Sequence, residues 1–300
     1  MIERARRITQ HVFAVLINSH FYVTGSSPIY MGKIKYTCFP VLNCYSCPLA
    51  VTACPIGAIQ STLSTLRPLL RAGLIPHIGL YVLGSIGLVA SIVGRMPCGW
   101  FCPFGLFQEY LYKIKTKKFR LPCWMGYIKY VVLLVFVVLM PMLLVDPLGF
   151  GETSFCKYIC PAGTLEAGLP LLALKPGLRQ LAGLLFSWKL LILISIIIWA
   201  IFVSRPFCRT ICPLGAILGL FNKVSLIKLK YDPDTCVECG ACKTICPTGV
   251  SFFDGTHSPN SPSCIRCFRC YSICPVCAIS ITTENGRKVI QQCTPKKSAS

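Results

Sequence analysis

Acidic side chains are scarce in this chain of 300 residues, in which 10 Asp and Glu stand against 30 Lys and Arg. Charged residues of both signs reach only 13% of the sequence, whereas hydrophobic residues make up 54%. So few charges cannot cover a soluble globule, and the composition is typical of a membrane protein. The basic residues flank apolar segments and do not form one face of a soluble domain, so we expect no nucleic-acid binding. We expect them to contact anionic lipid or an acidic electron carrier.

Several motifs that would indicate other classes of protein are also absent. No C-x-x-C-H motif occurs, which argues against attachment of a c-type haem. No tract rich in Met and His occurs, which argues against a copper-handling protein. No A-x-A-like site follows the basic N-terminal residues, so we expect the first apolar segment to be a retained helix and not a cleaved signal peptide.

Long apolar runs are present, and they predict membrane-spanning helices. Residues 74–94, 127–145 and 181–203 are each close to the roughly 20 residues that a bilayer core requires. A fourth candidate, residues 8–23, is shorter and more polar. We therefore predict four transmembrane helices, with Lys189 of the last one extending its ammonium group towards the membrane border.

The loops between these helices differ in their content of Lys and Arg. Residues 1–7, 95–126 and those after 203 fall on one side and are richer in basic residues than residues 24–73 and 146–180 on the other. The positive-inside rule places the richer side in the cytoplasm. We therefore predict a multi-pass protein of the cytoplasmic (inner) membrane, with its C-terminal region in the cytoplasm.

Twenty-one cysteines give the strongest functional signal, and seven of them are followed directly by proline. Two tandem C-x2-C-x2-C-x3-C-P runs occupy residues 236–247 and 264–275. In bacterial-type ferredoxins the first three cysteines of each run hold one [4Fe-4S] cluster and the fourth holds the other. The predicted ligand sets are Cys236, Cys239, Cys242 with Cys274, and Cys264, Cys267, Cys270 with Cys246. Zinc also favours C-x2-C pairs, but it requires neither the third cysteine at this spacing nor the following proline.

Two C-x3-C-P pairs predict a third cluster. Cys98 and Cys102 follow the second predicted helix, and Cys208 and Cys212 follow the fourth, on the same side of the membrane. One pair cannot complete a cubane, but two pairs at the ends of neighbouring parallel helices can. The pairs share a Cys-Pro-x-Gly ending, which strengthens the prediction of a site at the cytoplasmic membrane surface.

A third C-x3-C-P pair, Cys156 and Cys160, falls on the opposite side of the membrane. The same side carries four further cysteines in one loop, namely Cys38, Cys44, Cys47 and Cys54. We expect a fourth cluster held by the pair together with Cys54 and one or two of the other three. Disulfides remain an alternative here, because an extracytoplasmic face is oxidising.

Histidines near the membrane offer a further hypothesis. His20 and His77 would meet at the extracytoplasmic end of their helices and could bind a quinone. Hydrogen bonds from helix-end histidines to the backbone are an equally common arrangement. A haem between these residues is a weaker interpretation, since only two histidines lie at matching depth.

The motifs CGWFCPFG from Cys98 and CRTICPLG containing Cys212, with the tandem C-terminal runs, resemble the NapH/NosR type of membrane-bound polyferredoxin. The resemblance covers residues 74 to 281 or nearly so. It implies a four-helix membrane anchor with cytoplasmic [4Fe-4S] clusters. It also implies electron transfer between a quinol pool or a cytoplasmic donor and a redox partner.

The sequence therefore predicts a mainly α protein with a transmembrane domain (1–223) that carries cluster-binding loops on both faces. An α+β ferredoxin domain (224–293) and a disordered tail (294–300) follow. We expect an electron-transfer subunit without substrate chemistry of its own, with a ferredoxin, flavoprotein or reductase subunit as partner. A copper reductase or assembly factor, a transmembrane disulfide reductase and a sensory protein are the alternatives. A bilayer core of about 30 Å is too thick for one tunnelling step, so either the cysteine loops dip into it or a quinone bridges the gap.

Overall fold

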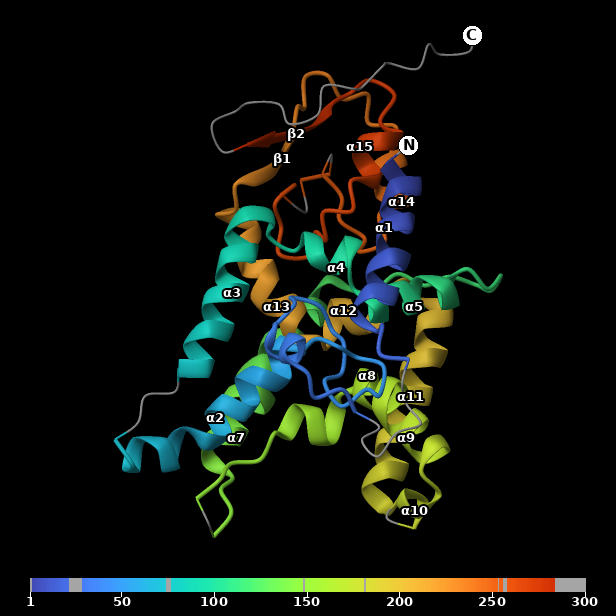
Figure 1. Cartoon of the computed structure of the whole chain (residues 1–300). Helices are drawn as coiled ribbons and strands as arrows, with labels where there is room; N and C mark the ends of the chain where they lie inside the picture. Colours follow the sequence, from blue (N-terminus) through green and yellow to red (C-terminus); the bar gives the residue numbers. More distant parts are fainter. Residues whose placement is uncertain are drawn as a thin grey trace.

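The structure, a computed structural model, describes residues 2–21, 29–73, 77–147, 149–180, 182–252, 254–255 and 258–283. It is mainly helical, with one small sheet near the C-terminal end of the described chain, as Figure 1 shows. The expectation of a mainly α protein is therefore confirmed at this level. The predicted tail, residues 294–300, lies outside the described residues.

Two helices of the described chain are long and apolar enough to cross a membrane. One runs continuously from Cys123 to Leu143, and the other, α11, spans Leu184–Phe202. The first consists of η2 (Cys123–Tyr127), α6 (Ile128–Val132), the π-helical η3 (Leu133–Leu139) and α7 (Met140–Leu143). Only about a fifth of each helix is buried inside the protein, and these two helices suggest association with a membrane.

The other two predicted spans differ from expectation. Helix α3 (His77–Val93) is apolar, but its 17 residues are fewer than a typical span requires. Helix α1 (Ile2–Ile17) begins before the predicted segment 8–23 and is amphipathic. Its Arg6 and Gln10 are fully buried in the protein, which holds the helix beside the C-terminal unit. Within the described residues, neither helix is both long and apolar enough to cross a membrane.

A helix that the sequence analysis did not predict, α2 (Pro55–Arg71), begins directly after Cys54. Three more helices start in the same way, with proline as the first residue after a cysteine: α5 (Pro103–Tyr112), α8 (Pro161–Gly163) and α13 (Pro213–Leu220). Proline suits this position because its fixed φ is already helical and its missing N–H group would have no partner there. The remaining short helices are η1 (Lys33–Tyr36), α4 (Met96–Trp100), η4 (Phe155–Ile159), η5 (Thr164–Gly168), α9 (Leu169–Leu174), α10 (Pro176–Arg179), α12 (Pro206–Thr210) and η6 (Phe221–Lys223).

The C-terminal unit contains the only sheet of the described chain. Strand β1 (Ile227–Tyr231) pairs antiparallel with β2 (Ile279–Thr283), and Leu229 lies opposite Ile281. Two short helices, α14 (Ala241–Ile245) and α15 (Arg269–Ile273), lie between the strands in sequence. In Figure 1 the sheet and α15 lie at one end of the molecule, and α9 and α10 lie at the other.

The C-terminal unit has a small hydrophobic cluster of its own around Leu229 and Phe268, and a larger cluster joins this unit to the helices. Its buried members include Cys54 and Cys160 from the middle of the chain, Cys102 and Cys212 beside the apolar helices, and Cys267 of the C-terminal unit. The cysteine-bearing loops therefore pack into a single interior. The domain boundary near residue 224 stays a prediction.

Candidate iron–sulfur sites

Six of the seven cysteines that precede proline, all except Cys47, flank a helix and share one backbone conformation. Their φ angles lie between −75° and −63° and their ψ angles between 108° and 127°. A residue before proline is driven into this extended region, because the proline ring would clash with a helical predecessor. The Cys-Pro dipeptide thus ends one segment and presents the thiol at the turn, which explains the repeated motif in physical terms.

The C-terminal unit brings together the two expected sets of cysteines. Site I is the cavity lined by Cys236, Cys239, Cys242 and Cys274. Site II is the cavity lined by Cys246, Cys264, Cys267 and Cys270. Each set takes the first three thiols of one run and the fourth thiol of the other run, as in a ferredoxin with two interlocked clusters.

Thiols of site II interact strongly with one another. Burial and, to a smaller extent, the neighbouring Cys246 thiol together raise the pKa of Cys264 to about 12 and that of Cys267 to about 11. Burial also raises the pKa of Cys270, with contributions from Cys267 and Cys264. Buried thiols with such pKa values become thiolates when a metal binds them, because coordination removes the proton.

Site III is formed by Cys98, Cys102, Cys208 and Cys212, which stand beside α4, α5, α12 and α13. Burial raises the pKa of Cys102, and the thiols of Cys208 and Cys98 raise it further. The pKa of Cys212 is raised in the same way, with Cys208, Cys98 and Cys102 as neighbours. The two C-x3-C-P pairs therefore meet in one buried place.

Two arginines link the two C-x3-C-P pairs of site III, and each one starts beside one pair and bonds to the other. Arg95 lies three residues before Cys98 and donates a hydrogen bond to the carbonyl of Cys208. Arg205 lies three residues before Cys208 and donates to the carbonyl of Cys98. Each guanidinium also occupies the space where a Cβ atom would stand on the glycine of the opposite Cys-Pro-x-Gly motif, Gly215 or Gly105. These exchanged arginines explain why the fourth residue of each motif is glycine.

The charges around site III fit an anionic group. Arg95, Arg205 and Lys129 are all fully buried, and Lys129 lies close enough to Cys212 and Cys98 to interact with them electrostatically. Within the described chain Arg95 has no carboxylate partner, and its Nε has no hydrogen-bond acceptor. Isolated buried charges are very costly, so a counter-charge belongs here. A cubane cluster with four thiolates carries about −2 in its oxidised form, which supplies that counter-charge.

Hydrogen-bond donors are directed at the sulfur atoms of several sites. At site III the amides of Gly105 and Gly215 each lie 3.4 Å from the Sγ atoms of Cys102 and Cys212. The amide Nε2 of Gln108 lies 3.1 Å from Cys208 Sγ. At site II the backbone N–H of Val250 lies 3.3 Å from Cys246 Sγ. Donors in these positions stabilise thiolate ligands and tune the reduction potential of a bound cluster.

Four of the six remaining cysteines lie close enough to interact with one another. We call these four site IV: Cys44, Cys54, Cys156 and Cys160. Burial raises the pKa of Cys160, and the thiols of Cys156, Cys44 and Cys54 add to this effect. Burial likewise raises the pKa of Cys156, with Cys54 and Cys44 as its neighbours. A Cβ atom on Gly163 would stand 3.7 Å from the Sγ atom of Cys44 and 4.0 Å from that of Cys160, so these two thiols lie close to the same glycine.

The other two cysteines of this region face elsewhere. Cys47 directs its thiol at Asn18 Oδ1, at 3.9 Å. Cys38 interacts with Cys54, and its backbone pairs with Ala53 in a β-bridge. All six cysteines are free thiols in the structure, so the arrangement contains no disulfide among them.

Two further residues support site IV and were missed or misinterpreted from sequence. The Glu166 carboxylate accepts a 2.6 Å hydrogen bond from the backbone N–H of Cys44, and burial raises its pKa to about 8. Lys189 donates to the carbonyl of Cys156 at 3.2 Å, so its ammonium group reaches the cysteine loop of site IV. Glu166 is a single acidic residue between Cys160 and α9, and no sequence pattern identifies it as part of a cysteine site.

Sites III and IV lie next to each other. Burial raises the pKa of Cys102, and a hydrogen bond from the backbone N–H of Leu42 partly offsets this. The backbone N–H of the next residue, Asn43, bonds in the same way to the thiol of Cys54. Two consecutive amides therefore point at thiols of two different sites. The loop 38–54 therefore folds inward to reach site III.

Site II touches site III in turn. A Cβ atom on Gly99 would stand 2.6 Å from the carbonyl oxygen of Ile265 and 3.6 Å from Cys267 Cα, so the two cysteine loops are in van der Waals contact there. The indole Nε1 of Trp100 donates to the carbonyl of Arg266 at 3.0 Å. The four sites consequently form one uninterrupted series, I to II to III to IV.

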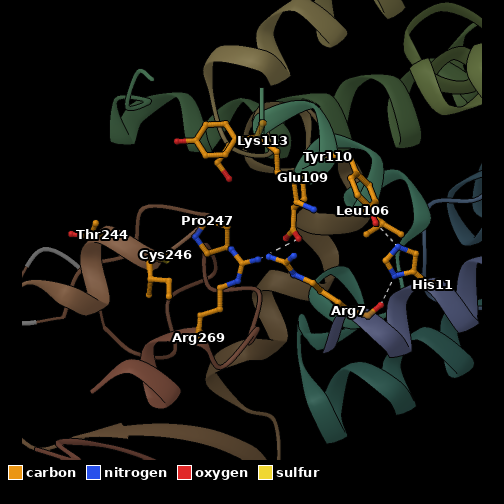
Figure 2. Close-up of a pocket in the computed structure, with 13 residues that line it drawn as sticks. Arg7, His11, Leu106, Glu109, Tyr110, Lys113, Thr244, Cys246, Pro247 and Arg269 are labelled. Atoms are coloured by element: carbon orange, nitrogen blue, oxygen red, sulfur yellow. Dashed lines mark hydrogen bonds and ion pairs between the residues drawn. The ribbon is translucent and has the colours of Figure 1, made fainter. Parts of the chain in front are cut away.

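A buried ion cluster fastens the C-terminal unit to the helices, and the sequence analysis did not predict it. Glu109 pairs with Arg6 at 2.8 Å, with Arg205 at 2.7 Å and with Arg269 at 3.4 Å. Glu3 joins Arg6 and Arg269 from the start of α1. Figure 2 shows Glu109 and Arg269 facing each other across a pocket between α1, α5 and the C-terminal unit. Although burial opposes it, these arginines lower the pKa of Glu109 to about 2.

The expected pair of His20 and His77 lies partly outside the described residues. His20 Nδ1 contacts the carbonyl of Pro48 at 2.9 Å, which is the helix-end arrangement considered as the alternative. The side chain of His77 lies outside the described residues. His11 is exposed and contacts Tyr110, at 2.5 Å between Nε2 and the hydroxyl. Among the described residues no three His, Cys, Asp or Glu side chains lie close enough to hold one single metal ion.

Comparisons with known families match most of the cysteine motifs. Residues 228–275 match a 4Fe-4S dicluster domain. Residues 75–122, 130–178 and 185–231 each match a 4Fe-4S binding domain, and each of these segments contains one C-x3-C-P pair. The segment that carries Cys44 and Cys54 lies outside these matches.

Several relatives are similar to this chain. An uncharacterized protein of Methanocaldococcus jannaschii is 33% identical over 55% of this chain and 63% of its own length. YccM of Escherichia coli, whose name assigns it provisionally to electron transport, is 22% identical over 63% of this chain and 52% of its own length. The regulatory protein NosR of Pseudomonas aeruginosa is 28% identical over 54% of this chain and 21% of its own length. The chain thus spans less than two thirds of these relatives. No solved structure matches it.

Proposed function

Because the chain is a 4Fe-4S ferredoxin-type polyferredoxin, distantly related to YccM and NosR, we propose that its four cysteine sets hold four [4Fe-4S] clusters that relay electrons along the molecule. The observation that carries this proposal is the unbroken contact from site II through Gly99 to site III and through Leu42 and Asn43 to site IV. One-electron transfer is the chemistry that such clusters supply when bound.

The residues of each site would hold and insulate its cluster. Apolar residues of the two hydrophobic clusters pack around most of the cysteines of sites II, III and IV. The exchanged arginines and Lys129 balance negative charge at site III, while Lys189 lies beside site IV. Site I lies nearest the exposed end, since Cys239 is exposed to solvent. A soluble redox protein such as a ferredoxin, flavoprotein or reductase subunit would exchange electrons there.

We also propose how the protein is placed in the membrane. Helices α1, α3 and α11 and the helix Cys123–Leu143 expose large apolar side chains, including Leu184 at 88% exposure. Exposed apolar surface of this extent indicates contact with lipid. We place these four helices in the cytoplasmic membrane, with α1 embedded through its exposed apolar face and the C-terminal unit in the cytoplasm. Support comes from the basic loops and from the two candidate spans.

Iron content tests the four sites and the choice of ligands together. Anaerobically purified protein should contain about sixteen irons and sixteen acid-labile sulfides per chain, four for each cubane. Cys44→Ala should lower both to about twelve, because Cys44 is one of the four mutually interacting thiols of site IV. Cys47→Ala should leave sixteen, because its thiol faces Asn18. Chemical iron and sulfide assays with EPR spin quantification give the values.

Cys47 is a matched control, since it lies three residues from Cys44 and is at least as buried. About eight irons in the wild-type protein would leave only sites I and II and contradict the relay. Twelve irons in Cys47→Ala with sixteen in Cys44→Ala would show that the ligand assignment at site IV is wrong while the relay stands.

A further inference from the structure

An apolar cavity of about 650 Å³ opens directly beside site IV. Its wall includes two cysteines of that site, Cys54 and Cys156, and is completed by residues of η1, α2 and the loop between them. Pockets that bind small molecules usually measure about 300–1,000 Å³ and are mostly apolar with a few polar groups. Size and position therefore both fit a ligand that exchanges electrons with site IV.

The chemistry of the wall narrows the ligand class. Tyr36 and Tyr45 contribute aromatic rings with hydroxyl donors, and Ala58 and Leu69 contribute apolar surface. Lys35 lines the cavity and donates to the carbonyl of Ala50 at 2.7 Å, so an ammonium group keeps two further N–H donors. The hydroxyls of Thr62 and Thr65 are bonded to their own helix. The wall thus offers rings, aliphatic surface and a few donors, but no acidic group.

The place of site IV in the series points to a redox-active occupant. Site IV ends the contact series at the pole opposite site I, and in the described chain no further cysteine set lies beyond it. A soluble protein docks through an exposed surface, whereas this wall is concave and apolar. A ligand with a flat ring and two carbonyl oxygens fits this wall. Its ring can stack on the aromatic side chains, and its oxygens can accept hydrogen bonds from the N–H and O–H groups.

We propose that this cavity binds the ring of a quinone, which exchanges electrons with site IV; the inference rests on the proposed relay function. A hydroquinone bound there loses two electrons, one at a time, and releases two protons to water at the cavity mouth, leaving the quinone. The reverse direction takes up two electrons and two protons. This location replaces the His20 and His77 hypothesis, because His20 does not line the cavity and its Nδ1 is occupied by Pro48.

Ser61→Phe tests the site by filling it. Ser61 lines the cavity from α2 and is exposed, so a phenyl ring there enters the open space without disturbing the core. The probe is a decyl-substituted quinone, with binding measured by equilibrium titration of purified holoprotein in lipid nanodiscs. We expect binding to weaken at least tenfold in Ser61→Phe. Ser195→Phe, at an exposed position of α11 away from the cavity, should bind as the wild type does.

A redox readout separates failure of this inference from failure of the relay. Dithionite should reduce the clusters of all three proteins equally, whereas the reduced decylquinol should reduce those of Ser61→Phe at least tenfold more slowly. Equal quinone binding by wild type and Ser61→Phe would overturn the cavity assignment, as would a retained phospholipid that the quinone cannot displace. Absence of dithionite-reducible clusters would instead overturn the relay itself.

Discussion

Glu109→Gln should destabilise the folded protein by about 3–5 kcal/mol, which is the usual cost of removing one partner of a buried ion pair. The carboxylate is only 11% exposed and neutralises Arg6 and Arg205, both fully buried. Without it these guanidinium groups are left together in the interior beside site III. Thermal unfolding of the holoprotein in detergent, followed by circular dichroism at pH 7, should show a midpoint lower by roughly 10 °C.

The pH dependence of this effect follows from the pKa of Glu109. Its value in the folded protein, about 2, lies below the ordinary 4.5, so the carboxylate stabilises the fold above pH 4.5. That contribution is lost as the pH falls from 4.5 towards 2, because the unfolded state takes up a proton in this range whereas the folded state stays ionised until the pH nears 2. The difference between wild type and Glu109→Gln should therefore be smaller at pH 3.5 than at pH 7.

Glu152→Gln provides the control for this prediction. Glu152 forms an ion pair with Lys157, but both side chains are partly exposed, and surface pairs contribute little to stability. The midpoint of this variant should stay within about 2 °C of the wild type. If Glu109→Gln behaved like Glu152→Gln, the ion cluster would not fasten the C-terminal unit to α1 and α5.

The sequence identified the parts of the candidate sites that are encoded locally. The spacing of Cys236, Cys239 and Cys242 alone predicts which thiols share a cavity, because so short a segment keeps the three thiols close together. The repeated Cys-Pro-x-Gly ending likewise connects Cys102 with Cys212. Both pairings rest on backbone constraints within a few residues.

Long-range features could not be read from the sequence in this way. Cys44 and Cys47 differ by three positions in one loop, and only the path of that loop against Cys160 and Glu166 decides between them. The position of α1 depends on Arg6, whose burial requires Glu109 from a distant helix. Basic residues before an apolar segment ordinarily indicate membrane topology, and nothing local shows that one of them is a buried ion-pair partner.

Arg95→Met should lower the reduction potential of one cluster by on the order of 100 mV, or prevent its assembly and remove about four irons. Arg95 is fully buried, has no carboxylate partner in the described chain and donates to the carbonyl of Cys208. Its positive charge favours the more negative, reduced form of a cluster at site III, so its removal makes reduction harder. Anaerobic redox titration followed by EPR measures the shift.

Lys115→Met removes one positive charge from an exposed loop and serves as the control for Arg95→Met. Water and salt screen an exposed charge, so no cluster potential should move by more than about 10 mV in this variant. Arg95→Lys keeps the charge but cannot bridge the carbonyls of Cys208 and Pro262 as a guanidinium does. It should therefore restore most of the potential while losing stability, which separates the electrostatic role of Arg95 from its structural one. An unchanged potential in Arg95→Met with full iron content would mean that the buried charges at site III serve another counter-ion than a cluster.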